Sequence, residues 1–189
     1  ELRDELPHHI VHPQEDYFGI ALYSRLPLEQ AEIRFLVEAD QPSIQARVVL
    51  PGGAEIRLVC LHPQPPGPGE SEDSVDRDTE LIRVARDLAD DTGPVIVTGD
   101  LNDVAWSRTT QLFRKISGLL DPRVGRGLYA TFPAALPFLR WPLDHFFHSG
   151  HFTLVQLTRL PRCGSDHFPI LAELALEPQN DNQKAPEAD

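Results

Sequence analysis

Six polar side chains of the kinds that bind cations and move protons stand at the ends of predicted strands, far apart in the sequence. They are His62, Asp100, Asn102, Asp144, Asp166 and His167. Catalytic groups favour such positions, because a rigid core holds the strand while its end faces a cleft. Carboxylates, an amide and histidines together suit metal-assisted attack of water on a phosphoester. A cation neutralises the phosphate oxygens, a carboxylate takes the water proton, and a histidine steadies or protonates the developing charge.

Each of these places also has a plainer interpretation. The segment Gly99-Asp100-Leu101-Asn102 is typical of an Asx turn that caps a helix, and taken alone it slightly favours that structure. Asp166 and His167 are neighbours at the start of a predicted strand, where they would point to opposite sides, or else form a turn. Asp144 lies in an apolar run, and because buried acids are seldom unpaired, a histidine is its expected partner.

Several function classes are excluded by what the sequence lacks. It contains no G-x-S-x-G elbow, no glycine-rich phosphate loop with a lysine and no dinucleotide fingerprint. Two cysteines, Cys60 and Cys163, are too few for a disulfide framework or a four-cysteine zinc site. The net charge of −12 disfavours non-specific coating of nucleic acid. No apolar run approaches the roughly 18 to 20 residues that span a bilayer.

The elements that must position these residues form one domain, residues 1–176, followed by a polar tail, residues 177–189, that we expect to be disordered. Alternating or continuous apolar patterns predict about eight strands and two helices. The helices are expected over residues 74–90 and 107–116. The strands are expected over residues 18–26, 33–39, 43–50, 55–61, 95–98, 143–147, 152–157 and 167–176. Hairpins combined with one strand–helix–strand unit predict a mixed α/β or α+β sandwich.

The motifs, taken together and in this order, resemble those of the endonuclease/exonuclease/phosphatase superfamily, the fold of pancreatic deoxyribonuclease. The resemblance extends from about residue 18 to residue 176 and implies an α/β (α+β) fold of two packed mixed β-sheets flanked by helices, a four-layer sandwich. Each motif alone is weak, whereas five in the correct order are strong. The five are Gly19–Arg25, His62, Gly99–Asn102, Leu143–Asp144 and Ser165–His167.

The resemblance also implies a role for each of the six residues. Asp100 would orient or deprotonate the attacking water, and Asn102 would hold the phosphate or that water. Asp166 would bind the divalent cation, Mg²⁺ or Mn²⁺. His167, paired with Asp144, would stabilise the pentacovalent phosphate. His62 would act as a second phosphate ligand or as a general acid.

One departure from the family pattern concerns the front of the fold. The family begins with two strands, and the second ends in a glutamate that is a principal metal ligand. Residues 1–6 resemble the helix that follows those strands, so we expect the chain to be a fragment whose first strands precede residue 1. Glu5 and Glu15 are not placed to substitute. The chain as given is therefore expected to bind metal weakly or not at all and to be weakly active or inactive, and its sheet to lack a neighbour. A membrane anchor upstream of residue 1, as in some bacterial members, is left open.

The function that follows is a divalent-metal-dependent phosphoester hydrolase, either a phosphodiesterase or nuclease, or a phosphatase. A nucleic acid, a phospholipid headgroup and a small phosphate ester all suit the same core, and no protein partner is implied. Arg108, Arg114, Lys115, Arg123 and Arg126 form either a basic strip for nucleic acid or, in the plainer interpretation, a solvated helix face and loop. The alternative is a non-catalytic binding domain of the same fold, and the sequence does not assign a compartment.

Overall fold

The computed structural model describes residues 2–15, 18–65, 74–136 and 138–177 of the 189-residue chain. A five-stranded sheet forms its centre, with strand order β3-β4-β5-β6-β7. Only β5 and β6 pair in parallel, and the other neighbours are antiparallel. The carboxyl ends of β5 and β6 therefore meet the start of β7 at one edge of the sheet. The strands are Leu28–Phe35, Pro42–Val49, Glu55–Leu61, Val95–Asp100 and Asp144–His148.

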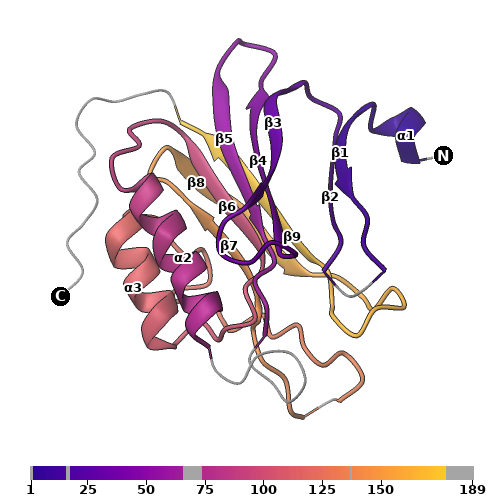
Figure 1. Cartoon of the computed structure of the whole chain (residues 1–189), viewed down its shortest axis with the longest axis vertical. Helices are drawn as coiled ribbons and strands as arrows, with labels where there is room; N and C mark the ends of the chain where they lie inside the picture. Colours follow the sequence, from indigo (N-terminus) through magenta and orange to yellow (C-terminus); the bar gives the residue numbers. More distant parts are fainter. Residues whose placement is uncertain (1, 16–17, 66–73, 137, 178–189) are drawn as a thin grey trace.

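Helices α2 (Val75–Leu88) and α3 (Arg108–Ser117) lie side by side against the central sheet (Figure 1). The buried residues of α2 recur at helical spacing, so one apolar stripe faces the sheet. Ser107 begins α3 by accepting a hydrogen bond from the Thr110 amide, and Gly118 ends it in the left-handed conformation. The core between the helices and the sheet includes Leu81, Val84, Ala85 and Leu88 of α2, Phe113 of α3, and Val59, Leu61, Val97 and Phe147 of the strands.

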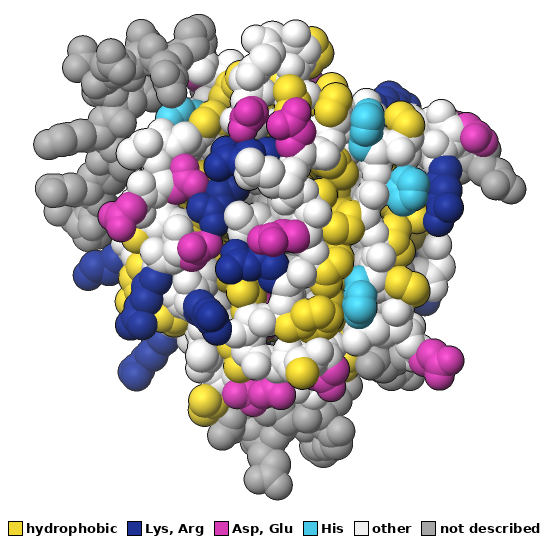
Figure 2. All heavy atoms as spheres, turned by 45° about the horizontal axis from the view of Figure 1, so that its top comes forward, with side chains coloured by type: hydrophobic (Ala, Val, Ile, Leu, Met, Phe, Trp, Pro, Cys, Tyr) yellow, Lys and Arg dark blue, Asp and Glu magenta, His cyan; other side chains and the backbone are white. Residues whose placement is uncertain are grey.

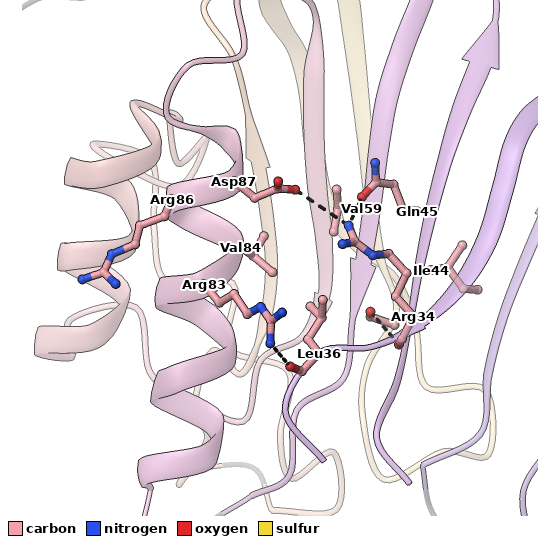
Figure 3. Close-up of a pocket in the computed structure, with 10 residues that line it drawn as sticks. Arg34, Leu36, Ile44, Gln45, Val59, Arg83, Val84, Arg86 and Asp87 are labelled. Carbon is pink, nitrogen blue, oxygen red and sulfur yellow. Dashed lines mark hydrogen bonds and ion pairs between the residues drawn. The ribbon is translucent and has the colours of Figure 1, made fainter. Parts of the chain in front are cut away.

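A cavity of about 360 Å³ opens between α2 and strands β3 to β5. Figure 3 shows Val84 pointing from α2 toward the sheet, while Arg86 points away from it. Arg83 donates to the Leu36 carbonyl, and Arg34 donates to Gln45 Oε1 over 2.7 Å. None of the six candidate residues lines this cavity. The cavity is therefore distinct from the strand edge where those residues gather.

The other face of the central sheet carries two antiparallel hairpins. β1 (His8–His12) pairs with β2 (Ile20–Ser24), and β8 (Phe152–Arg159) pairs with β9 (Ile170–Leu176). The first hairpin contacts β3 and β4. The second hairpin follows β7 in the chain, and the ring of Phe152 at its start lies 6.2 Å from the ring of His148 at the end of β7. The one-turn helix α1 (Leu2–Glu5) lies beside the first hairpin (Figure 1). The predicted fold class, mixed α and β with packed sheets flanked by helices, is confirmed.

Three element predictions were wrong in position. The strand β1 was not predicted, because its three histidines hide the alternation that pairing with β2 creates. β3 begins five residues before its predicted start and ends at Phe35, since a bulge and exposed polar residues break its pattern. The last strand begins at Ile170, so His167 lies in a loop rather than on the strand.

The predicted disordered tail lies outside the described residues from residue 178 onward, as do residues 66–69 of the proline-rich loop. Over the described ranges, no helix has the length and apolar character needed to cross a membrane.

Candidate active site

Sheet register brings the candidate residues of three strands to one edge. Asp100 and Asp144 are direct cross-strand partners on β6 and β7, so their side chains share a face. Leu61 pairs with Gly99 on the parallel strands β5 and β6, which places His62 beside Asp100. This is the edge where the carboxyl ends of β5 and β6 meet the start of β7. Residues that are 38 and 44 positions apart in sequence therefore converge through the pairing of the strands.

Gly99 allows β6 to approach β5 closely where the site begins. Its φ of +144° lies in the region that favours glycine, and a Cβ there would stand 1.9 Å from the Leu61 carbonyl oxygen. Beyond it, the Asn102 amide donates to Asp100 Oδ1 over 2.9 Å, which is an Asx turn, and Asn102 has a φ of +49°. The turn fixes the Asp100 carboxylate, so the turn and the site are the same feature rather than alternatives.

His167 reaches the site from the loop before β9. Its Nδ1 lies 2.8 Å from Asp144 Oδ2, in a hydrogen bond, and its Nε2 lies 3.6 Å from Asp100 Oδ2. Backbone hydrogen bonds hold this loop, from the Ala134 amide to the Asp166 carbonyl and from the Phe168 amide to the Thr131 carbonyl. His62 approaches from the other side, with Nε2 at 3.9 Å from the same Asp100 oxygen. Asp100 Oδ2 thus faces two imidazole rings.

The charges of the site shift two of its ionisable groups. Burial, followed by the charge of Asp144, raises the pKa of Asp100 above its usual value. Burial acts to lower the pKa of His167, but the hydrogen bond and charge of Asp144 and the charge of Asp100 outweigh it, and the pKa is raised. The carboxylate is therefore a stronger base and the imidazole a weaker acid than in water. The pair suits a proton acceptor beside a cationic ring.

Asp100, Asp144 and His167 each offer one ligand atom within 4.8 Å of the others, a group that could hold a metal ion. The two carboxylates are the hard oxygen ligands that a divalent cation prefers. Asp166 lies outside this group. Its side chain is exposed and accepts a hydrogen bond from the Ser165 hydroxyl at 3.4 Å, so its role as a metal ligand stays a prediction.

Asn102 is at the site but its side chain is engaged. The amide nitrogen Nδ2 donates to the Pro63 carbonyl over 2.9 Å, which ties the chain after β5 to the end of β6. Its predicted task of holding phosphate or water would require this amide to leave Pro63 or to act through its oxygen.

Sequence reasoning missed the aromatic rings and the hydroxyl that support the site. The Phe132 ring packs against His167 at 4.8 Å between centroids, and Phe18 packs against His62 at 5.6 Å. Thr131 is buried, and its hydroxyl accepts from the Asp144 amide at 3.4 Å. These residues carry no motif, because their contribution depends on contacts between segments that only the fold defines.

Arg123 corrects the interpretation of a basic strip. The guanidinium is buried, pairs with Asp121 at 2.8 Å and donates to His145 Nδ1 at 2.7 Å, so it is not available to a nucleic acid. His145, the sequence neighbour of Asp144, is bonded to this arginine, and the histidine that partners Asp144 is His167.

Comparison with known proteins agrees with this geometry. A UPF0294 protein of Vibrio cholerae serotype O1 is 33% identical over 139 residues, which are 71% of this chain and 45% of that protein. The chain thus spans about half the length of the curated relatives it matches.

Solved structures show the fold at lower identity. The human Nocturnin catalytic domain, with bound sulfate, superposes with a TM-score of 0.72 at 16% identity, covering 89% of this chain and 72% of that one. An endonuclease/exonuclease/phosphatase from Bacteroides vulgatus has a TM-score of 0.72 at 18% identity, covering 93% and 78%. A mannosyl-6-phosphatase of Bacteroides thetaiotaomicron has a TM-score of 0.64 at 18% identity, covering 84% and 71%.

The model of one family, described as the Endonuclease/Exonuclease/phosphatase family, matches residues 2–167. This match covers every one of the six candidate residues, from His62 to His167, as well as the strands that carry them. The chain therefore belongs to the endonuclease/exonuclease/phosphatase family, a family of phosphoester hydrolases.

Proposed function

We propose that this chain is the core of a divalent-metal-dependent phosphoester hydrolase that directs water at phosphorus. The observation that carries the proposal is the convergence of His62, Asp100, Asp144 and His167 from four separate segments on one strand edge. A structural role alone would not need two imidazole rings facing one partly exposed carboxylate oxygen. Each of these groups retains access to solvent, which a substrate requires.

Asp100 takes a proton from the attacking water in this proposal. Burial and the charge of Asp144 raise its pKa, which strengthens the carboxylate as a base. As the water oxygen bonds to phosphorus, its proton passes to Asp100 and the bond from phosphorus to the leaving oxygen breaks. The leaving oxygen takes a proton from His62, or from solvent where His62 acts only as a phosphate ligand.

His167 stabilises the charge that builds on the phosphate oxygens. Asp144 accepts a hydrogen bond from Nδ1, which fixes the ring and favours its protonated form, and leaves Nε2 to face the reacting group. Asn102 orients Asp100 through its backbone amide and is proposed to hold the phosphate or the water once its side chain is released from Pro63.

A divalent cation, Mg²⁺ or Mn²⁺, fits the donor set. Asp166 is proposed to hold it from the loop before β9, which leaves Asp100 to accept the proton from water. When bound, the cation supplies neutralisation of the phosphate oxygens.

The test measures hydrolysis of a chromogenic phosphodiester and of the matching monoester by the purified chain with excess Mn²⁺. We expect only slow turnover, because the chain is expected to bind metal weakly or not at all. A chelator should abolish it, and Asp100→Asn should lower it by about 10²-fold or more, because the carboxylate base is lost. His151→Ala, in the turn between β7 and β8, is the matched control and should keep full activity. Equal rates for the wild type and Asp100→Asn would instead favour the non-catalytic binding domain.

The ratio of diester to monoester turnover separates a phosphodiesterase from a phosphatase. If the diester is preferred, single-stranded and duplex DNA are compared with it. A nuclease requires DNA to be cut faster than the simple diester.

A further inference from the structure

One loop beside the site exposes an unusual amount of apolar surface. The bridge between Phe132 and Trp141 closes its base, and in Figure 1 the loop projects at the bottom, below the sheets. Phe138 is 98% exposed, Leu139 57% and Leu136 48%. Large apolar side chains that gather on a projecting loop are disfavoured in water and typically mark an interaction surface.

The chain around this loop is basic although the protein is acidic. Residues 122–165 contain five arginines and a single acid, Asp144, whereas the whole chain carries a net charge of −12. Asp121 and Asp166 flank this segment, and Asp121 is paired with Arg123. On the face that Figure 2 brings forward from the top of Figure 1, basic and acidic side chains are instead interspersed. Once the buried pair of Arg123 and Asp121 is set aside, Arg126, Arg140, Arg159 and Arg162 remain in this segment.

Three of these arginines lie around the segment that carries His167. Arg140 and Arg159 stack over the ring of Phe168, at 4.8 and 4.6 Å, and Arg162 donates to the Ser165 carbonyl. The loop contacts the same segment, through the Phe132 ring on His167 and through the Ala134 amide on the Asp166 carbonyl. The loop and the three arginines therefore both contact the segment that carries His167.

We propose that the loop between Phe132 and Trp141 docks on the surface of an anionic phospholipid bilayer, with Leu136, Phe138 and Leu139 entering the interface. Arg140, Arg159 and Arg162 would pair with lipid phosphates, and His167 would face a headgroup phosphoester as the substrate. This inference rests on the proposed function for its substrate, though not for its binding. In the reaction, water bonds to the headgroup phosphorus, one phosphorus–oxygen bond breaks, and the leaving oxygen gains a proton.

A bilayer fits this surface better than a nucleic acid does. Among the residues that the structure describes at the tip, two of the three large exposed apolar side chains are leucines, which cannot stack on bases. Single-strand binders instead array aromatic rings along a basic groove. Aliphatic and aromatic side chains backed by cations are instead the combination that binds an anionic membrane interface. One apolar contact gives marginal binding, and the arginines supply the second attraction that stable attachment needs.

The experiment measures co-sedimentation of the full chain with vesicles of phosphatidylcholine and phosphatidylglycerol in a two-to-one ratio, and with vesicles of phosphatidylcholine alone. We expect binding to the anionic vesicles, weakened at least roughly tenfold by Phe138→Ser combined with Leu139→Ser, and roughly fivefold by Arg162→Gln. Leu112→Ser on α3, a leucine 45% exposed outside the loop, should bind like the wild type.

Folding and catalysis are checked separately on the same samples. The substituted side chains are exposed, so the double variant should keep the wild-type urea midpoint and its turnover of the soluble phosphodiester. Absence of vesicle binding, or equal binding by the double variant, overturns the docking proposal whatever the activity. Binding of single-stranded DNA in place of vesicles, with the same loss in the double variant, overturns it in favour of a nucleic acid. Vesicle binding by a chain that hydrolyses no phosphoester leaves the docking supported and refutes the proposed function.

Discussion

Asp144 and His145 are neighbours on β7 yet belong to two clusters of opposite character. The outer cluster consists of His62, Asp100, Asp144 and His167. The inner cluster consists of Asp121, Arg123 and His145. Successive side chains of a strand point to opposite faces, so Asp144 faces the hairpins while His145 faces the helix side of the sheet. One peptide bond separates a candidate reaction centre from a buried ionic network.

Solvent access differs sharply between the clusters. The outer side chains are between 17% and 27% exposed, whereas Asp121 and Arg123 are 3% and 6% exposed. Burial, then the charge of Arg123, lowers the pKa of His145 to about 4. Burial acts to raise the pKa of Asp121, but the hydrogen bonds and charge of Arg123 outweigh it and the pKa is lowered. In the inner cluster, Asp121 and Arg123 therefore form a buried ion pair, and His145 beside them is neutral at pH 7.

The two histidines also differ in what their ring nitrogens have left to offer. Both nitrogens of His145 are used, since Nδ1 accepts from Arg123 and Nε2 donates to the Asp103 carbonyl. Within the described part of the chain, His167 makes a hydrogen bond through Nδ1, to Asp144, and its Nε2 lies 3.6 Å from Asp100 Oδ2. Residue type therefore does not assign a role to these histidines. What distinguishes them is whether a ring nitrogen is left without a hydrogen bond and has access to solvent.

The largest expected effect is on turnover by His167→Ala. We expect kcat for the chromogenic phosphodiester to fall about 10³-fold, because the cationic ring that faces the phosphate is lost. The urea midpoint should barely move, since the side chain is partly exposed. A variant with wild-type kcat would place His167 in the structural class with His145.

The next effect is on stability and comes from the inner cluster. Arg123→Met should lower the free energy of unfolding by about 3 kcal/mol, because Asp121 is left as a buried unpaired charge. Urea denaturation measures the loss. Combining it with Asp121→Asn removes that charge and should restore part of the stability. If the single substitution costs nothing, the inner pair is not a structural element.

The pH dependence of stability tests the neutral His145. Its pKa is about 4 in the folded chain and 6.5 in the unfolded chain, so between these values the unfolded chain binds more protons. Stability is complete above pH 6.5 and is lost as the pH falls toward 4. We expect His145 to account for a loss of about 2 kcal/mol between pH 7 and pH 5. The slope should be smaller in His145→Gln, and an unchanged slope would contradict the assignment.

The smallest effect is expected from Asp144→Asn. This substitution removes the charge that raises the pKa of His167, so kcat should fall about tenfold and the alkaline limb of the pH–rate profile should move to lower pH. Asp121→Asn is the matched control on the inner cluster, and it should change stability without moving that limb. Identical pH–rate profiles for wild type and Asp144→Asn would separate Asp144 from the reaction.

Much of the fold could be predicted from local patterns. The alternation of residues 55–61 and the continuous β-branched run of residues 95–98 each lie within an observed strand, β5 and β6, because one or both faces of these strands are buried. The helix α3 covers Arg108–Ser117, one residue from its predicted range of 107–116 at each end. Hydrophobic patterns did not predict β1 or the start of β3, because these strands are defined by pairing with a neighbouring strand and not by burial.

The candidate site was predicted as a list of residues and not as a set of contacts. Asp100, Asn102, Asp144, His62 and His167 do lie together at one strand edge, whereas Asp166 stands outside the close group with its side chain exposed. The aromatic rings of Phe18 and Phe132 had no sequence signal, since their contacts with histidines span 44 and 35 residues.

By itself the sequence determined which chemical groups are present and that His62, Asp100 and Asp144 stand at strand ends, because strand patterns and side-chain chemistry are local properties. Only the tertiary structure decided that Asp144 pairs with His167 and that His145 is shielded by Arg123. The physical reason is that partnership and burial depend on sheet register and on packing between distant segments. These contacts set solvent access and neighbouring charge, and through them the protonation of each histidine.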